Sequence, residues 1–180
     1  SGEASDKIGF GEHQYPPCPE RSQEAPENIG DLQHTLWQIK QTKPLDFPFE
    51  HAFYCDLFPG SLYEDLVHTF PLSSMHQLLI NPFDKDGQQR PILSLENLAN
   101  GKALVDAATK QAWSRLDKIL HSREFTSELF TKFGLEDYIG KYTGPVTRLL
   151  AHDAGFELDI HPDKSNKLMT MMLYFPSFSL

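Results

Sequence analysis

The sequence predicts an α+β fold in which helices pack on one face of a sheet. Apolar residues recur at helical spacing in several segments between residues 31 and 133, and the longest stripe of this kind lies between residues 100 and 120. After Gly144 the period changes, and three short strands joined by turns are predicted. A run of helices followed by a run of strands is typical of a sheet with helices on one face.

Length and composition restrict the class of protein. At 180 residues, with 39% hydrophobic residues, the chain can form one ordinary globular domain. The formal net charge of -9 argues against nucleic acid as a partner, because phosphate binding needs clustered Lys and Arg. No apolar stretch approaches the roughly 18 residues that cross a bilayer, so we expect no membrane contact. The oligomeric state is left open.

The two cysteines and the first residues bear on compartment and domain limits. Cys18 and Cys55 can form at most one bridge and have no CxxC spacing, which favours a reducing compartment and a soluble cytoplasmic protein. Residues 1–30 are rich in Pro, Glu, Ser and Gly, and we interpret them as a flexible arm. The domain is predicted over residues 31–180. It is expected to be incomplete at its C-terminus, because Leu180 follows an apolar segment with no closing helix.

The first predicted helix covers residues 31–40, with Asp31 available as its N-cap and Pro44 beyond its end. Residues 47–58 are aromatic and predicted to be extended. A second helix then runs up to Pro71, with apolar residues at i, i+4 and i+8. Most aromatic side chains here and in the next helix are expected in the core: Phe47, Phe49, Phe53, Tyr54 and Trp113.

Two further helices are predicted before the strands. Residues 100–120 carry the clearest helical stripe, with Lys and Asp on the opposite side. Residues 124–133 form another helix, which Gly134 ends because glycine readily adopts the left-handed conformation that follows a helix C-terminus.

Three strands are predicted after Gly144. Residues 146–151 are an apolar run interrupted by Arg148, and residues 156–163 alternate strictly between apolar and polar. Residues 168–175 form a long apolar strand. Its methionines are expected to fill the core: Met169, Met171 and Met172.

The second predicted strand, FELDIHPD, carries the candidate site. Because a strand sends alternate side chains to opposite faces, His161 and Asp163 share a face. Their imidazole nitrogen and carboxylate oxygen are two of the three ligands of a 2-His-1-carboxylate iron site. Asp159 lies on the same face, where it is either a contact for a cationic substrate group or part of a plain polar surface.

The order of residues around this strand resembles the iron(II)/2-oxoglutarate-dependent oxygenases of the prolyl-hydroxylase-like superfamily. The pattern is Arg-Leu-Leu-Ala-x-x-x-Gly-x-x-x-x-x-His-x-Asp, a polar loop, and then Lys-Leu-x-Thr-x-x-Leu-Tyr. The resemblance is strongest over residues 146–176 and weaker over residues 47–71. It implies a double-stranded β-helix, or jelly roll, with N-terminal helices buttressing one sheet.

The resemblance also implies an activity. Iron(II) and the co-substrate 2-oxoglutarate would serve the O2-dependent hydroxylation of an unactivated C–H bond of a small molecule or an amino-acid side chain, giving succinate and CO2. His161 and Asp163 would bind iron, and Tyr174 would bind 2-oxoglutarate, with Thr170 on the same face of its strand. Arg148 would support co-substrate or substrate, or would be a salt-bridge partner instead.

Two residues that the family needs do not follow Asp163. The family has a second His downstream and an Arg or Lys about one strand later, whereas Lys164 and Lys167 lie too early. We therefore interpret the chain as the N-terminal part of such an enzyme. The alternative is a non-catalytic jelly-roll binding module or pseudoenzyme, since a fold does not settle a function.

Overall fold

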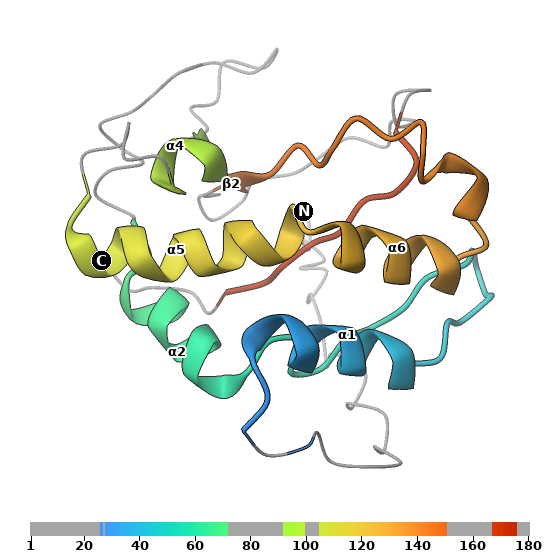
Figure 1. The fold of residues 1–180 in the computed structure, drawn as a ribbon, viewed down its shortest axis with the longest axis horizontal. Helices are drawn as coiled ribbons and strands as arrows, with labels where there is room; N and C mark the ends of the chain where they lie inside the picture. Colours follow the sequence, from blue (N-terminus) through green and yellow to red (C-terminus); the bar gives the residue numbers. More distant parts are fainter. Residues whose placement is uncertain (1–25, 27, 72–91, 100–104, 151–166, 176–180) are drawn as a thin grey trace, which may run out of the picture.

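The computed structural model describes residues 26, 28–71, 92–99, 105–150 and 167–175. These residues form an α+β structure, in which helices surround a central α5 and a small antiparallel sheet lies at one side (Figure 1). The elements in chain order are α1 (Asp31–Gln41), α2 (Gly60–His68), β1 (Ile92–Ser94), α4 (Leu95–Ala99), α5 (Ala107–Leu120), α6 (Arg123–Lys132), the 3-10 helix η1 (Glu136–Tyr138) and β2 (Arg148–Leu150).

The longest described helix, α5, begins at Ala107 because Asp106 caps it. The Asp106 carboxylate accepts a hydrogen bond from the backbone N–H of Thr109 at 2.7 Å, and this bond lowers the pKa of Asp106. A helix in this region is confirmed. Its predicted start near residue 100 is too early, because Val105 and Asp106 are not helical.

Helix α6 and the turn after it agree closely with the sequence prediction. The Ser122 hydroxyl accepts a hydrogen bond from the backbone N–H of Phe125 at 3.1 Å and so caps the first turn. At the other end Gly134 has φ +62°, and the N–H of Leu135 donates to the carbonyl of Phe130 at 2.7 Å. This is the Schellman arrangement, so the helix-ending role predicted for the glycine is confirmed.

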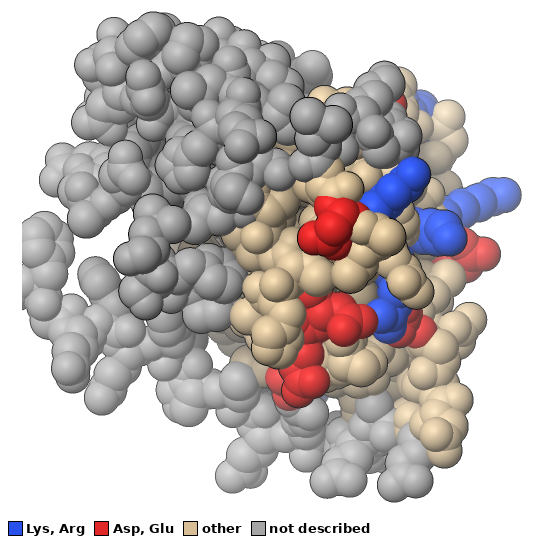
Figure 2. All heavy atoms as spheres, turned by 90° about the vertical axis from the view of Figure 1, so that its left-hand side faces the viewer, with Lys and Arg blue, Asp and Glu red and all other residues tan. Residues whose placement is uncertain are grey.

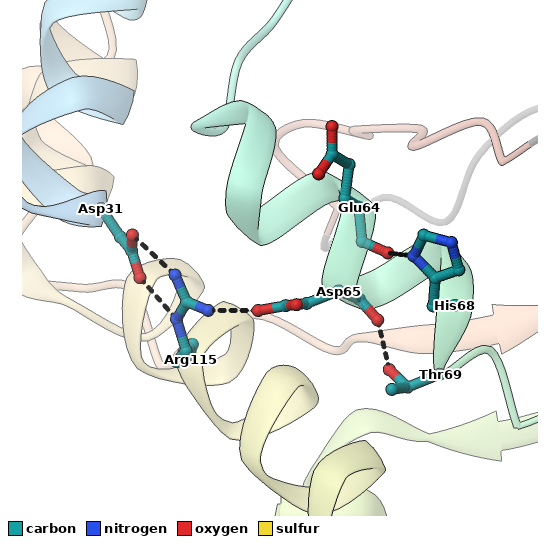
Figure 3. Close-up of polar contacts among 6 residues, drawn as sticks. All are labelled: Asp31, Glu64, Asp65, His68, Thr69 and Arg115. Atoms are coloured by element: carbon teal, nitrogen blue, oxygen red, sulfur yellow. Dashed lines mark hydrogen bonds and ion pairs between the residues drawn. The ribbon is translucent and has the colours of Figure 1, made fainter.

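Helix α1 begins at Asp31 as predicted and ends one residue beyond the predicted range, but its N-cap differs from the prediction. Its N-cap is Gly30, and Asp31 lies in the first helical turn. The Asp31 carboxylate accepts two hydrogen bonds from the Arg115 guanidinium, at 2.8 and 3.0 Å, and Arg115 also donates to Asp65 at 2.7 Å (Figure 3). The predicted capping role of Asp31 is therefore wrong, because a cation on α5 binds its carboxylate.

The hydrophobic core lies where α1, α2, α4 and α6 pack around α5. Leu62 and Leu66 of α2 are fully buried, as their spacing predicted. β1 and α4 were not predicted, yet they place three fully buried side chains in this core: Leu93, Leu95 and Leu98. A strand of three residues and a helix of five are too short to show a period in the sequence.

The aromatic stretch over residues 47–58, predicted to be extended, forms no strand in the structure. Leu45 and His51 make an isolated antiparallel bridge, and the chain turns back between them. The distances from backbone nitrogen to carbonyl oxygen across this bridge are 2.7 and 2.8 Å. Phe47, Phe49 and Phe53 are 84%, 68% and 48% exposed, so their predicted place in the core is wrong. A turn that closes on itself leaves its side chains outside the helical core.

The other two predicted core aromatics do pack inward. Trp113 is buried, and Tyr54 is partly buried against the core. Burial raises the pKa of Tyr54 to about 12, because the charged phenolate loses solvation. The core prediction therefore holds for Trp113, which lies within α5, and for Tyr54, which precedes α2.

The structure also bears on the expected compartment. Cys55 is disulfide-bonded. Disulfides are typical of oxidising compartments, so this bond does not support the reducing compartment that the cysteine spacing favoured. No helix among the described residues is long and apolar enough to cross a membrane.

Replacing Gly134 by alanine tests the turn that ends α6. Gly134→Ala is expected to lower the free energy of unfolding by about 1 kcal/mol, because an L residue is strained at positive φ. Gly140→Ala is the matched control, since neither glycine has an atom within 4 Å of an added Cβ and only Gly134 has positive φ. Urea unfolding followed by circular dichroism measures both. Equal losses in the two variants would contradict the conformational explanation.

Candidate functional site

The predicted iron ligands, His161 and Asp163, lie outside the described residues, as does Asp159. The structure therefore describes the site through the segments on either side of residues 151–166. These segments are β2, which carries Arg148, and the extended chain of residues 167–175, which carries Thr170 and Tyr174. Each of these three side chains can be placed relative to the helical core.

Residues 168–175 are extended and alternate between two faces. Along this segment Met169, Met171, Leu173 and Phe175 pack against the hydrophobic core. The residues between them are exposed: Leu168, Thr170, Met172 and Tyr174. The alternation of burial agrees with the prediction, but residues 168–175 are not a strand in the structure and pair with no other strand within the described part of the chain. Met172 is 64% exposed, so its predicted core role is wrong.

Phe175 anchors the end of this segment in an aromatic cluster. Its ring stacks on Tyr63 of α2, with centroids 6.1 Å apart and planes 4° from parallel. It also contacts Phe70 at 5.4 Å and Trp113 at 5.7 Å. Sequence analysis missed this anchor, although the period-two pattern of residues 168–175 already placed Phe175 on the same face as Met169 and Met171.

The cluster that receives Phe175 is itself fixed by a hydrogen bond. The indole N–H of Trp113 donates to the carbonyl of Thr69 at 3.1 Å, just past the end of α2. The ring of Phe70 meets Trp113 edge-on at 5.8 Å, an arrangement that aromatic pairs favour. Trp113 is buried in the core, and the extended segment passes between α5 and α2 (Figure 1). The surface of α2 and α5 that contacts this segment is here called the helical wall.

Thr170 and Tyr174 share the face that points away from this wall. Strand parity predicted that the two residues share a face, and both are exposed in the structure. The Tyr174 hydroxyl donates to the sulfur of Met172 at 3.3 Å. A thioether is a weak acceptor, so this bond is weaker than one that the phenol would make to a carboxylate.

Arg148 lies on β2 opposite Ser94 of β1. Its neighbour Leu149 is buried, whereas Arg148 itself is exposed, so the strand alternates as expected for an edge of the core. Arg148 makes no ion pair with a described residue, and so the salt-bridge role finds no partner in this part of the structure.

The described residues do not by themselves form a metal centre. Within the ranges that the structure covers, no group of three or more His, Cys, Asp or Glu side chains is arranged to hold a metal ion. On the face shown in Figure 2, the described residues present both Lys or Arg and Asp or Glu side chains, lying close to one another. Comparison with protein-family models, curated proteins and solved structures finds no match to the chain.

Removing the Phe175 ring tests whether it anchors the extended segment. Phe175→Ala is expected to lower the free energy of unfolding by about 2 kcal/mol. The reason is that the substitution removes a partly buried aromatic ring together with its contacts to three other rings. Met172→Ala is the control from the exposed face of the same segment and should change stability by less than about 0.5 kcal/mol. The measurement is chemical unfolding followed by tryptophan fluorescence. Similar values for the two variants would show that Phe175 does not anchor the segment.

Proposed function

We propose that the chain belongs to an iron(II)- and 2-oxoglutarate-dependent oxygenase with a jelly-roll fold, which hydroxylates a small molecule or an amino-acid side chain. The proposal rests on the order of residues from Arg148 to Tyr174. An apolar strand bearing an arginine is followed by the alternating FELDIHPD and then by a segment whose threonine and tyrosine have the same parity.

One structural observation carries the proposal beyond the motif. Residues 168–175 direct their apolar face onto the helical wall, and Phe175 anchors them there. As a result Thr170 and Tyr174 are both on the opposite face, where polar groups able to bind a co-substrate are needed. A segment with the other parity would bury Tyr174 against α5 and leave no phenol available for 2-oxoglutarate.

The donor set fits iron(II) by its chemistry. His161 would supply an imidazole nitrogen and Asp163 a carboxylate oxygen, and a site with these ligands and one further histidine is typical of non-haem iron oxygenases. When bound, iron(II) would supply the O2 chemistry that oxidises the substrate C–H bond and converts 2-oxoglutarate to succinate and CO2. The aspartate supplies an anionic oxygen ligand, which suits a divalent cation that also binds imidazole nitrogen.

The remaining residues would position the reactants. The Tyr174 hydroxyl would donate a hydrogen bond to the distal carboxylate of 2-oxoglutarate in place of its weak bond to Met172. Arg148, which has no ion pair among the described residues, would add positive charge for the co-substrate or substrate carboxylate. Asp159 would bind a cationic group of the substrate, because a carboxylate facing a dry site needs a partner.

Metal titration tests the ligand assignment. His161→Ala is expected to lower iron(II) affinity at least about tenfold, because it removes one of two protein ligands supplied by this motif. His121→Ala is the control, because His121 lies outside the predicted site, at the end of α5. Its imidazole Nδ1 is hydrogen-bonded to the backbone carbonyl of Asp117. Anaerobic calorimetry with iron(II) measures both, and circular dichroism checks that helix content is kept. Unchanged affinity in the His161 variant would refute the assignment.

Co-substrate binding tests the role of Tyr174. Tyr174→Phe should raise the Kd for 2-oxoglutarate about tenfold in the presence of iron(II), since a hydrogen bond to a charged group contributes about 1.5 kcal/mol. Tyr138→Phe serves for comparison, because Tyr138 is an exposed tyrosine of η1. Competition between labelled and unlabelled 2-oxoglutarate gives both constants. An equal Kd for the parent and the Tyr174 variant would show that the Tyr174 hydroxyl does not bind 2-oxoglutarate.

A further inference from the structure

An exposed apolar surface lies on the loop of residues 45–53, here called the aromatic loop. Four large hydrophobic side chains of this loop are between 48% and 84% exposed: Leu45, Phe47, Phe49 and Phe53. Exposed apolar side chains gathered in one place mark a surface that another group covers, because single exposed hydrophobics are common but clusters are not. None of these four residues belongs to the site discussed above.

The aromatic loop has a defined shape. Leu45 and His51 exchange both backbone hydrogen bonds across its base. The Nδ1 of His51 lies 2.7 Å from the carbonyl of Phe49, and its ring is 5.3 Å from the rings of both Phe49 and Phe53. The three rings therefore form a continuous surface along one side of the loop. Binding to an apolar surface that is already ordered loses less conformational entropy than binding to a flexible one.

A covalent bond lies directly beside this surface. Cys55, two residues after Phe53, is disulfide-bonded, and the sequence contains one other cysteine, Cys18. A bond between the two would hold their Cα atoms about 4.4–6.8 Å apart. The residues around Cys18 read Tyr-Pro-Pro-Cys-Pro, which is the most proline-rich stretch of the first 30 residues.

We propose that residues 15–19 of this chain pack on the aromatic loop and are held there by a Cys18–Cys55 disulfide. Proline-rich segments bind aromatic surfaces well, because their polyproline conformation is formed before binding and costs little entropy. The bond supplies an effective concentration on the order of mM or higher, so weak individual contacts suffice. The N-terminal arm is thereby an internal ligand that covers Phe49 and Phe53.

Charge on the loop argues against two other occupants. Asp46 and Glu50 are exposed next to the phenylalanine rings. An anionic membrane surface would repel them. In a symmetric dimer formed through this loop, the two carboxylates would approach those of the second copy, because the same patch meets itself across a two-fold axis. The neutral segment Tyr-Pro-Pro-Cys-Pro brings no such repulsion.

Peptide mapping without reductant tests the covalent part of the proposal. Digestion of the oxidised 180-residue chain should release one disulfide-linked pair that contains Cys18 and Cys55 from monomeric protein. Recovery of that pair only from covalent dimers, or of both cysteines as free thiols, would overturn the proposal.

Photo-cross-linking tests the packing. Phe47 is replaced by p-benzoylphenylalanine, and irradiation is expected to link this position to residues 12–20 of the same chain. The same probe at Val146, which is also highly exposed, should not label the arm. In a Cys18→Ser background the yield at position 47 should fall at least about tenfold, because the tether is lost.

Two outcomes at position 47 would overturn the packing. Cross-links between two chains would make a second copy the occupant, and the absence of arm cross-links in the oxidised protein would show that the surface is bare. A variant with Pro16→Ser and Pro17→Ser keeps the disulfide and removes only the packing, so a yield equal to that of the parent would also contradict the proposal. Neither experiment depends on iron, so failure here leaves the proposed oxygenase function untouched.

Discussion

The structure depends first on the burial of Trp113 in the middle of α5. Its indole N–H binds the carbonyl of Thr69, and its ring meets Phe70 and Phe175. One side chain thus joins α2, α5 and the extended C-terminal segment. Because a large aromatic ring fills its place only in one arrangement of neighbours, its position also sets the parity of residues 168–175.

Polar contacts tie the outer helices to this centre. Arg115 binds Asp31 of α1 and Asp65 of α2, and Lys132 of α6 donates to the carbonyls of Lys40 and Thr42 at 2.9 Å, at the end of α1 (Figure 3 shows the arginine). The Arg115 pairs are partly exposed, so solvent screens them and each contributes little to stability. Their effect is on geometry, because they hold α1 and α2 at fixed places relative to α5.

The candidate site uses this scaffold indirectly. Packing of one face of the extended segment against the helical core leaves the other face exposed. Thr170 and Tyr174 lie on the exposed face. Their common face was predictable from strand alternation alone. Which face it would be was not, because that depends on Phe175 fitting between α2 and α5. The pairing of Arg148 with Ser94 likewise joins segments that are distant in sequence and carry no local signal.

The sequence by itself determined the features that depend on neighbours along the chain. These are α1, α2, α5 and α6 from apolar spacing, the turn at Gly134 from the need for positive φ, and the alternation of residues 168–175. Only the tertiary structure decided that Asp31 binds Arg115 instead of capping α1, that β1 pairs with β2, and that Phe47 and Phe49 lie outside the core. The physical reason is that a helix period or a turn is set within a few residues. The partner of a charge, the mate of a strand and the burial of a loop are set by parts of the chain that meet only on folding.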